Sequence, residues 1–325
     1  MVKKIKKFKI KRILSLVLVC FVILFMGKYF EVDSYAYNPT PAVSIEPASI
    51  PFFYEFPEPL ATGQMTQYGN NVEIDYSNTS DGYIMARLLK PTPRQVILRV
   101  TSPTDIVYTY LISTVRNYTV IPLSYGDGYY KVEVCKSLEG NLYAIVSVLE
   151  IDVTLSNDLA PFKRANQYIN FNPGDKIVTK AAHLVREDHN TMEKVNTIYN
   201  YVIDNLTYDI EFANSVINGE QKRYIPDLDS VLERGKGVCF DYAALITGML
   251  RSQGIPTQLV IGYAGDVYHA WIKVYSEESG SFVDAIEFDG SWNLLDPSFD
   301  SALKSNPIAL RFFSQDRQYE EMFIF

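Results

Sequence analysis

The pattern of hydrophobic and polar positions changes its period once along the chain, close to residue 157. From about residue 71, apolar side chains alternate with polar ones in short runs, separated by turn signals such as Gly126-Asp127-Gly128. Alternation of this kind predicts strands that are buried on one face. The runs are Val72–Tyr76, Tyr83–Leu88, Gln95–Val100, Ile106–Ile112, Tyr118–Ile121, Tyr129–Cys135 and Leu142–Leu155. Seven strands at this spacing predict an all-β sandwich of immunoglobulin-like type.

After residue 158, several stretches have helical spacing instead. The segment from Thr191 to Leu206 places its apolar residues on one side. A second helical run begins at Cys239, and Gly254 followed by Pro256 supplies its C-terminal stop. We expect a helix of about four turns that begins at the cysteine and buries one face.

Two short strands complete the pattern of this second half. One contains His269 in an alternating run, and the other ends at Asp296, where Pro297 turns the chain out of the sheet. The fold class expected for the C-terminal half is therefore α+β. In this fold the Cys239 helix packs against an antiparallel sheet that carries His269 and Asp296.

Cys239, His269 and Asp296 have the chemistry of a nucleophilic site. A thiol at a helix N-terminus lies near unpaired backbone N–H groups, which favour the thiolate. His269 would take the thiol proton and later protonate a leaving amine, while Asp296 would fix the tautomer and orientation of the imidazole. These roles predict acyl transfer through a thioester.

Each of the three residues also has a structural interpretation when taken alone. A lone cysteine in a helix is most often a small buried side chain. A lone histidine on a strand is commonly a satisfied core or surface residue, and Asp before Pro usually starts a turn. The catalytic interpretation therefore depends on the three residues occurring together and in this order.

The motifs around these residues resemble those of the transglutaminase-like superfamily. They are GKGVCFDYAAL, LRSQGIPTQLVIGY, YHAW and WNLLDPSFD, in that order, between about residues 165 and 300. The resemblance implies a papain-like core, with Cys239 as nucleophile, His269 as base and Asp296 as orienting carboxylate. Many relatives have Ala-Trp-Asn after the histidine, whereas Ile272 and Lys273 follow Ala270-Trp271 here. This departure puts the acyl-acceptor side in doubt.

Tyr208 and Trp271 are further candidates for substrate binding. Domains of this superfamily often carry a Tyr-Asp pair where Tyr208 and Asp209 stand, near the active-site cleft, although a tyrosine that ends a helix is more often packing. Trp271 follows His269 by two positions in the YHAW motif. The backbone N–H of Cys239 is the expected oxyanion donor.

Residues 1–36 are of a different kind. Basic residues between Lys3 and Arg12 precede an uncharged apolar run from Ile13 to Met26, and Ser34-Tyr35-Ala36 offers a small-x-small cleavage site. The run is shorter than the roughly 20 residues that a membrane-spanning helix needs. We expect an export signal cleaved after Ala36 and an extracellular or cell-surface protein. A retained membrane anchor through residues 13–26 is the alternative.

The expected organisation has four parts. A signal peptide or signal anchor at 1–36 precedes a Pro-rich linker at 37–65, a β-sandwich domain at 66–157 and a transglutaminase-like catalytic domain at 158–325. The sandwich contains no histidine and no glycine-rich phosphate loop. We therefore expect it to serve as a spacer or a binding module.

Net charge and cysteine content limit which ligands, metals and partners the protein is expected to bind. The net charge is −8, and without residues 1–36 it becomes −14, from 22 basic and 36 acidic residues, which disfavours nucleic acid. Cys135 and Cys239 are the cysteines left after cleavage, and both are expected to be free, with Cys135 structural. Three histidines and no Cys-x-x-Cys pair leave no ligands for zinc. We expect no metal and no cofactor.

Three functions remain open at this stage. The first is an exported cysteine acyltransferase that transamidates protein glutamine side chains, with a protein or peptide substrate, an amine acceptor and contact with the cell envelope. The second is a cysteine protease or amidase in which water resolves the thioester on peptide or cell-wall amides. The third is a non-catalytic surface binding module that keeps the fold. Shielding of the thioester from water separates the first two, and an inert thiol would indicate the third.

Overall fold

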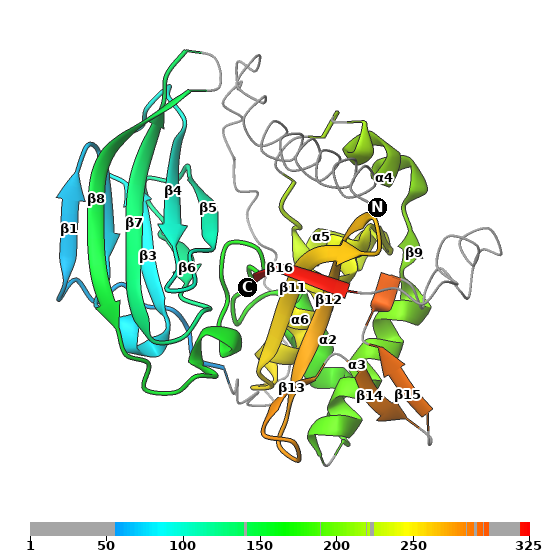
Figure 1. The fold of residues 1–325 in the computed structure, drawn as a ribbon. Coiled ribbons are helices and arrows are strands. Elements are labelled where there is room, and N and C mark those ends of the chain that lie inside the picture. Colours follow the sequence, from blue (N-terminus) through cyan, green and yellow to red (C-terminus); the bar gives the residue numbers. More distant parts are fainter. Residues whose placement is uncertain are drawn as a thin grey trace, which may run out of the picture.

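The computed structural model describes residues 56–139, 142–188, 190–218, 220–221, 224–283, 285–288, 291–294, 296–298 and 319–325. The export signal expected at 1–36 lies outside these residues, as do residues 37–55 of the expected linker. Figure 1 shows a part built of strands β1 to β8 beside a part that contains the helices. An all-β sandwich followed by an α+β half is the predicted fold class, and the structure confirms it.

Two four-stranded antiparallel sheets form the sandwich. Their strand orders are β1-β2-β3-β6 and β5-β4-β7-β8. The strands are β1 (Thr66–Gly69), β2 (Val72–Asp75), β3 (Tyr83–Leu88), β4 (Val96–Thr101), β5 (Val107–Ile112), β6 (Thr119–Pro122), β7 (Gly128–Ser137) and β8 (Tyr143–Val153). The expected alternation is clearest in β4, where Val96, Leu98 and Val100 are buried and the residues between them are partly exposed.

Strand β1 is the one strand of the described sandwich that the sequence pattern does not predict. Its residues are Thr-Gln-Tyr-Gly and none is buried. It lies at a sheet edge and pairs with β2 through the backbone, from Thr66 opposite Asp75 to Gly69 opposite Val72. Backbone pairing of this kind leaves no hydrophobic alternation to detect.

The C-terminal half surrounds one central helix, α6 (Cys239–Ser252), in which every residue from Asp241 to Ser252 is buried. It packs against α2, α3 and α5 and also against strands β11 and β12. The other elements are α2 (Lys176–Leu184), α3 (Thr191–Asn205), α4 (Ile210–Ile217), α5 (Leu228–Arg234), β9 (Thr207–Tyr208), β10 (Lys236–Gly237), β11 (Thr257–Ala264), β12 (Val267–Ser276), β13 (Ser281–Val283), β14 (Ala285–Phe288), β15 (Ser291–Leu294) and β16 (Tyr319–Ile324). The sequence predicts the start of α6 at Cys239 and the start of α3 at Thr191, and α3 ends one residue before the expected Leu206.

Strand β16 connects the two halves of the molecule. It pairs with β11 in the sheet order β13-β12-β11-β16, and its end near Phe325 points toward the sandwich (Figure 1). There the rings of Phe323 and Phe325 lie 5.7 and 5.6 Å from the ring of Tyr108 on β5. The hydroxyl of Tyr125 donates to the carbonyl of Met322 at 3.4 Å.

A buried charge fixes the far end of α6. Arg251 is fully buried, and its guanidinium donates to the carbonyl oxygens of Thr257 at 2.7 and 2.9 Å, Arg164 at 2.7 Å and Phe325 at 2.7 Å. These carbonyls belong to three segments that are far apart in the sequence. One side chain thus holds the segment before α2, the start of β11 and the end of β16 against α6.

We predict that Arg251→Met lowers the free energy of unfolding by about 3–5 kcal/mol, because it removes the charged donor of the buried Thr257 carbonyl and of the Arg164 and Phe325 carbonyls. Urea unfolding of the purified protein measures the change. The matched control is Arg186→Met, since Arg186 is exposed and pairs with the exposed Glu187. The control should stay within about 0.5 kcal/mol of the parent, and equal stability of the two variants would contradict the prediction.

Candidate active site

Cys239 is placed by a short parallel ladder just before α6. Strand β10 pairs with β9, with Lys236 opposite Thr207 and Gly237 opposite Tyr208. The chain then enters the helix at Cys239, whose free thiol is partly exposed. The predicted position of the cysteine at a helix N-terminus is therefore the observed one.

The fully buried Asp241 fixes the turn that leads into α6. Its Oδ2 accepts the backbone N–H of Val238 at 2.8 Å, and its Oδ1 accepts from Arg234 at 3.0 Å and from the hydroxyl of Tyr224. A Cβ on Gly237 would lie 2.5 Å from the Cβ of Asp241, so only glycine allows this approach. The Gly-x-Cys-x-Asp pattern is thus explained by the packing around the carboxylate.

His269 lies on β12 with its side chain toward α6 and is 5% exposed. Its Nε2 is 2.7 Å from Oδ2 of Asp296, which is 1% exposed. The thiol of Cys239 lies beside the same imidazole and raises its pKa. Because Asp296 engages Nε2, Nδ1 is the nitrogen left for the thiol. The structure therefore brings Cys239, His269 and Asp296 together in one series of contacts.

Asp296 reaches His269 from a different element than we expected. Strand β15 pairs with β14 in a separate two-stranded sheet, and Asp296 follows β15 rather than lying in the sheet of His269. The expectation that one sheet carries both residues is wrong. The physical reason is that the backbone of Ser291–Leu294 forms its ladder hydrogen bonds with Ala285–Phe288 in a separate hairpin. Asp296 lies in the segment that follows this hairpin.

Asp296 accepts hydrogen bonds on both carboxylate oxygens. The hydroxyl of Ser298 donates to Oδ1 at 3.1 Å, and the hydroxyl of Tyr319 donates to Oδ2 at 2.7 Å. Neither donor was identified from the sequence. Ser298 lies inside the WNLLDPSFD motif and could have been noticed, whereas Tyr319 is 23 residues away on β16 and carries no local signal.

The charges of this site favour a protonated His269. Burial alone would lower the pKa of the imidazole. The negative charge of Asp296, its hydrogen bond and the contact with Cys239 outweigh burial and raise the pKa of His269 from 6.5 to about 10. A carboxylate in contact with an imidazole has this effect because it stabilises the cation. At neutral pH the site therefore contains an imidazolium ion between Asp296 and the sulfur of Cys239.

Tyr208 and Trp271, the two substrate-binding candidates, lie in different surroundings. Tyr208 is on β9, where its hydroxyl lies beside the backbone N–H of Cys239. Burial, followed by the charges of Cys239 and Asp296, raises the pKa of the phenol. The phenol thus stays protonated and available as a donor.

Trp271 is fully buried and stacks behind His269 with ring centroids 6.4 Å apart, so the structure places it in the core rather than on a surface open to substrate.

The C-terminal half of the chain is similar to known proteins. Residues 178–297 match the model of the transglutaminase-like superfamily. This segment is a transglutaminase-like domain. The superfamily is generally enzymatic and includes cysteine proteases and transglutaminases.

Individual relatives match this chain over limited lengths. Kyphoscoliosis peptidase of Mus musculus is 28% identical over 120 residues, which are 37% of this chain and 17% of that protein. The Homo sapiens protein of that name is 27% identical over 154 residues, which are 46% of this chain and 22% of that protein. The match thus spans about a fifth of these relatives. The periplasmic domain of TgpA from Pseudomonas aeruginosa is similar with a TM-score of 0.33 and 15% identity, covering 54% of this chain and 72% of that one.

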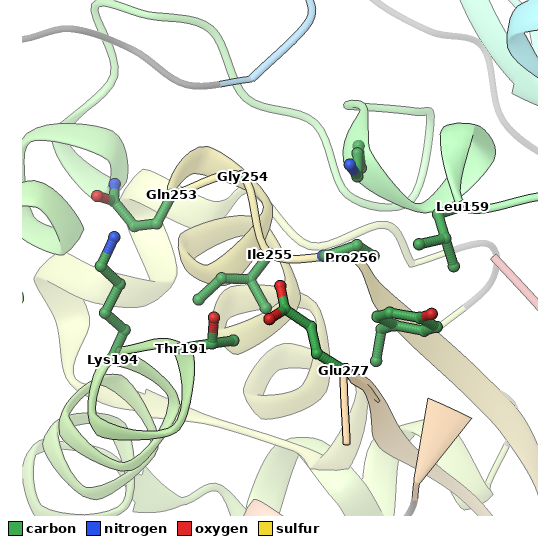
Figure 2. Close-up of a pocket in the computed structure, with 10 residues that line it drawn as sticks. Leu159, Thr191, Lys194, Gln253, Gly254, Ile255, Pro256 and Glu277 are labelled. Carbon is green, nitrogen blue, oxygen red and sulfur yellow. The ribbon is translucent and has the colours of Figure 1, made fainter. Parts of the chain in front are cut away.

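A hollow of about 210 Å³ lies at the other end of α6. Gln253, Gly254, Lys194 and Glu277 are among its lining residues (Figure 2). Helix α6 rises roughly 1.5 Å per residue over its length, so the hollow is roughly 20 Å from Cys239. It is therefore distinct from the Cys239 site and contributes nothing to its chemistry.

Two further structural findings concern the described part of the chain. No cluster of three or more His, Cys, Asp or Glu side chains in these residues is arranged to hold a metal ion. Over the same residues, no helix combines the length and apolar character that crossing a bilayer requires. His183 is exposed on α2, whereas His189 lies outside the described residues.

We predict that the imidazole of His269 titrates near pH 10 in ¹⁵N-histidine NMR spectra. Because the folded pKa lies above the unfolded value of about 6.5, the protonated imidazole contributes stability that is fully present below pH 6.5. That contribution is lost as the pH rises through 10. With three histidines in the chain, His269→Gln assigns the signal.

The matched variant is Asp296→Asn, which keeps the shape of the side chain but removes its charge. Burial then dominates, and the titration of His269 should move below pH 6.5. A parent protein that already titrates near 6.5 would contradict the proposed charge state.

Proposed function

We propose that the chain is an exported cysteine acyltransferase that forms a thioester on Cys239 and transamidates protein glutamine side chains. The observation that supports this function best is the contact series from the Cys239 thiol through His269 to Asp296, at the start of a buried helix. The charged run and the apolar segment of residues 1–36 support export to the cell surface. The sandwich would then act as a spacer or recognition module ahead of the transglutaminase-like domain.

The reaction would proceed in two steps. The Cys239 thiolate attacks the amide carbonyl of glutamine, and the His269 imidazolium donates its proton to the leaving ammonia as the C–N bond breaks. A primary amine then attacks the thioester carbonyl and gives its proton to His269, and the C–S bond breaks to release Cys239 as the thiolate while the new amide forms. Asp296 remains ionised throughout and holds the imidazole with Nδ1 toward the sulfur.

The tetrahedral intermediate needs donors for its oxyanion. The backbone N–H of Cys239 is at the helix start, and the Tyr208 hydroxyl lies beside it. A protonated phenol next to that N–H is suited to donate to the oxyanion as negative charge develops there.

Hydrolysis of the thioester is the second candidate function. The curated relatives of Mus musculus and Homo sapiens are named as peptidases, and the Cys239 thiol is partly exposed, so water can compete with an amine. The same residues would then act as a cysteine protease or amidase on peptide or cell-wall amides.

We predict that the purified protein incorporates a labelled primary amine into a glutamine-containing peptide, detected by mass spectrometry. Cys239→Ala should abolish the reaction, and His269→Ala should slow it by about 10²–10⁴-fold. The matched control is Cys135→Ala, because Cys135 is buried in β7 of the sandwich. New peptide termini or deamidated glutamine would favour the hydrolase, and a Cys239 thiol that is inert to iodoacetamide would contradict both reactions.

We also predict that Tyr208→Phe lowers the acylation rate constant by about 10²–10³-fold with little change in KM, because an oxyanion donor acts mainly in the transition state. Tyr275→Phe serves as the control, since Tyr275 lines the distant hollow. If Tyr208→Phe raised KM alone, the phenol would contact the substrate rather than the oxyanion.

A further inference from the structure

The hydroxyl of Tyr319 shares one carboxylate oxygen with His269. It donates to Oδ2 of Asp296 at 2.7 Å, the same distance at which His269 Nε2 approaches that oxygen. Ser298 occupies the other oxygen, Oδ1. Rotation about the bond between Cβ and the carboxyl carbon is soft for an isolated aspartate. Donors on both oxygens restrict that rotation and define where Nε2 must point.

The ring of Tyr319 packs into the same cluster as the imidazole. It lies edge-on to Trp271 with centroids 4.9 Å apart and at 6.5 Å from the ring of His269. Trp271 in turn stacks behind His269 at an interplanar angle of 19°. The phenol therefore has little freedom to leave Asp296 without disturbing the indole that supports the imidazole.

Contacts at the C-terminal end of β16 hold this strand, and with it Tyr319, in place. Leu259 and Phe325 exchange two backbone hydrogen bonds at 2.9 and 3.0 Å, and Arg251 binds the carbonyl of Phe325. Next to Tyr319, Lys273 of β12 forms an ion pair with Glu321. The position of the hydroxyl is thus set by contacts that do not involve Asp296.

Gly262 of β11 permits this close pairing. It faces His269 across the β11–β12 ladder, and a Cβ there would lie 2.0 Å from the carbonyl oxygen of Glu320 and 2.9 Å from the ring of Trp271. Any side chain at this position must push β16 away. The glycine in β11 next to His269 therefore allows β16, which carries Tyr319, to pair closely with β11.

We propose that Tyr319 is a positioning residue for the proposed reaction: its hydroxyl fixes Asp296 so that the imidazole of His269 faces the Cys239 thiol. This inference rests on the proposed function, because the orientation has a consequence only where His269 serves Cys239. Tyr319 itself touches neither the thiol nor the bond that would break.

The test compares Tyr319→Phe with the parent protein by two measurements. Tyr319→Phe keeps the ring and the pairing of β16 but removes the donor. We expect alkylation of Cys239 by iodoacetamide at pH 7, read by mass spectrometry, to slow about tenfold or more, as for loss of a hydrogen bond to a charged group. The Nε2–H signal of His269 in ¹⁵N-histidine spectra should broaden or shift, because its acceptor is no longer fixed.

Two further variants sharpen the comparison. Tyr275→Phe, on β12 but at the distant hollow, should leave both measurements unchanged. Gly262→Ala retains Tyr319 but displaces β16, and it should reproduce the slower alkylation and the altered Nε2–H signal.

An unchanged signal and rate in Tyr319→Phe would overturn the proposal, as would slower alkylation with an unchanged signal. The proposed function fails separately. If the parent Cys239 is inert while the His269 signal still responds to Tyr319→Phe, the positioning contact stands and the reaction does not.

Discussion

The burial of helix α6 is the constraint on which the rest of the C-terminal half depends. Because all residues from Asp241 to Ser252 are buried, the helix must be covered by a sheet on one side and by helices on the other. Its ends then carry the polar chemistry. The Cys239 thiol reaches partial exposure at one end, and Arg251 brings a charge into the core at the other. The carbonyls around Arg251 define where three distant segments meet the helix.

The contact of His269 with Asp296 is a buried ion pair, and such a pair is a poor means of stabilising a fold. Removing two charges from water costs several kcal/mol, and apolar side chains of the same volume are often as stable or more so. Here the cost is offset by hydroxyl donors from Ser298 and Tyr319 on the two carboxylate oxygens. A pair that needs this much support is better explained by chemistry than by stability, which is why the proposed function rests on it.

The sequence predicts features that depend on residues close together along the chain and misses features that depend on contacts between distant segments. Strands such as β4 and the start of α6 at Cys239 depend on local periodicity and on helix-end signals, so the sequence shows them. Strand β1 pairs through its backbone at a sheet edge and has no periodicity. The separate β14–β15 hairpin and the contact of Tyr319 with Asp296 depend on how distant segments meet. Local patterns therefore identify Cys239, His269 and Asp296 but not the groups that hold them in place.

The sandwich contacts the strand β16 mainly through aromatic side chains and contributes no reacting group to the site. The same strand that carries Tyr319 at one end carries Phe323 near the other, and Tyr108 and Tyr125 of the sandwich pack on or bind to that end. Without the sandwich these aromatic rings would face water, at a cost that grows with the apolar area exposed. Strand β16 would then be less firmly held against β11. Whether the sandwich serves as a spacer or as a binding module, it therefore also stabilises the strand on which the orientation of Asp296 depends.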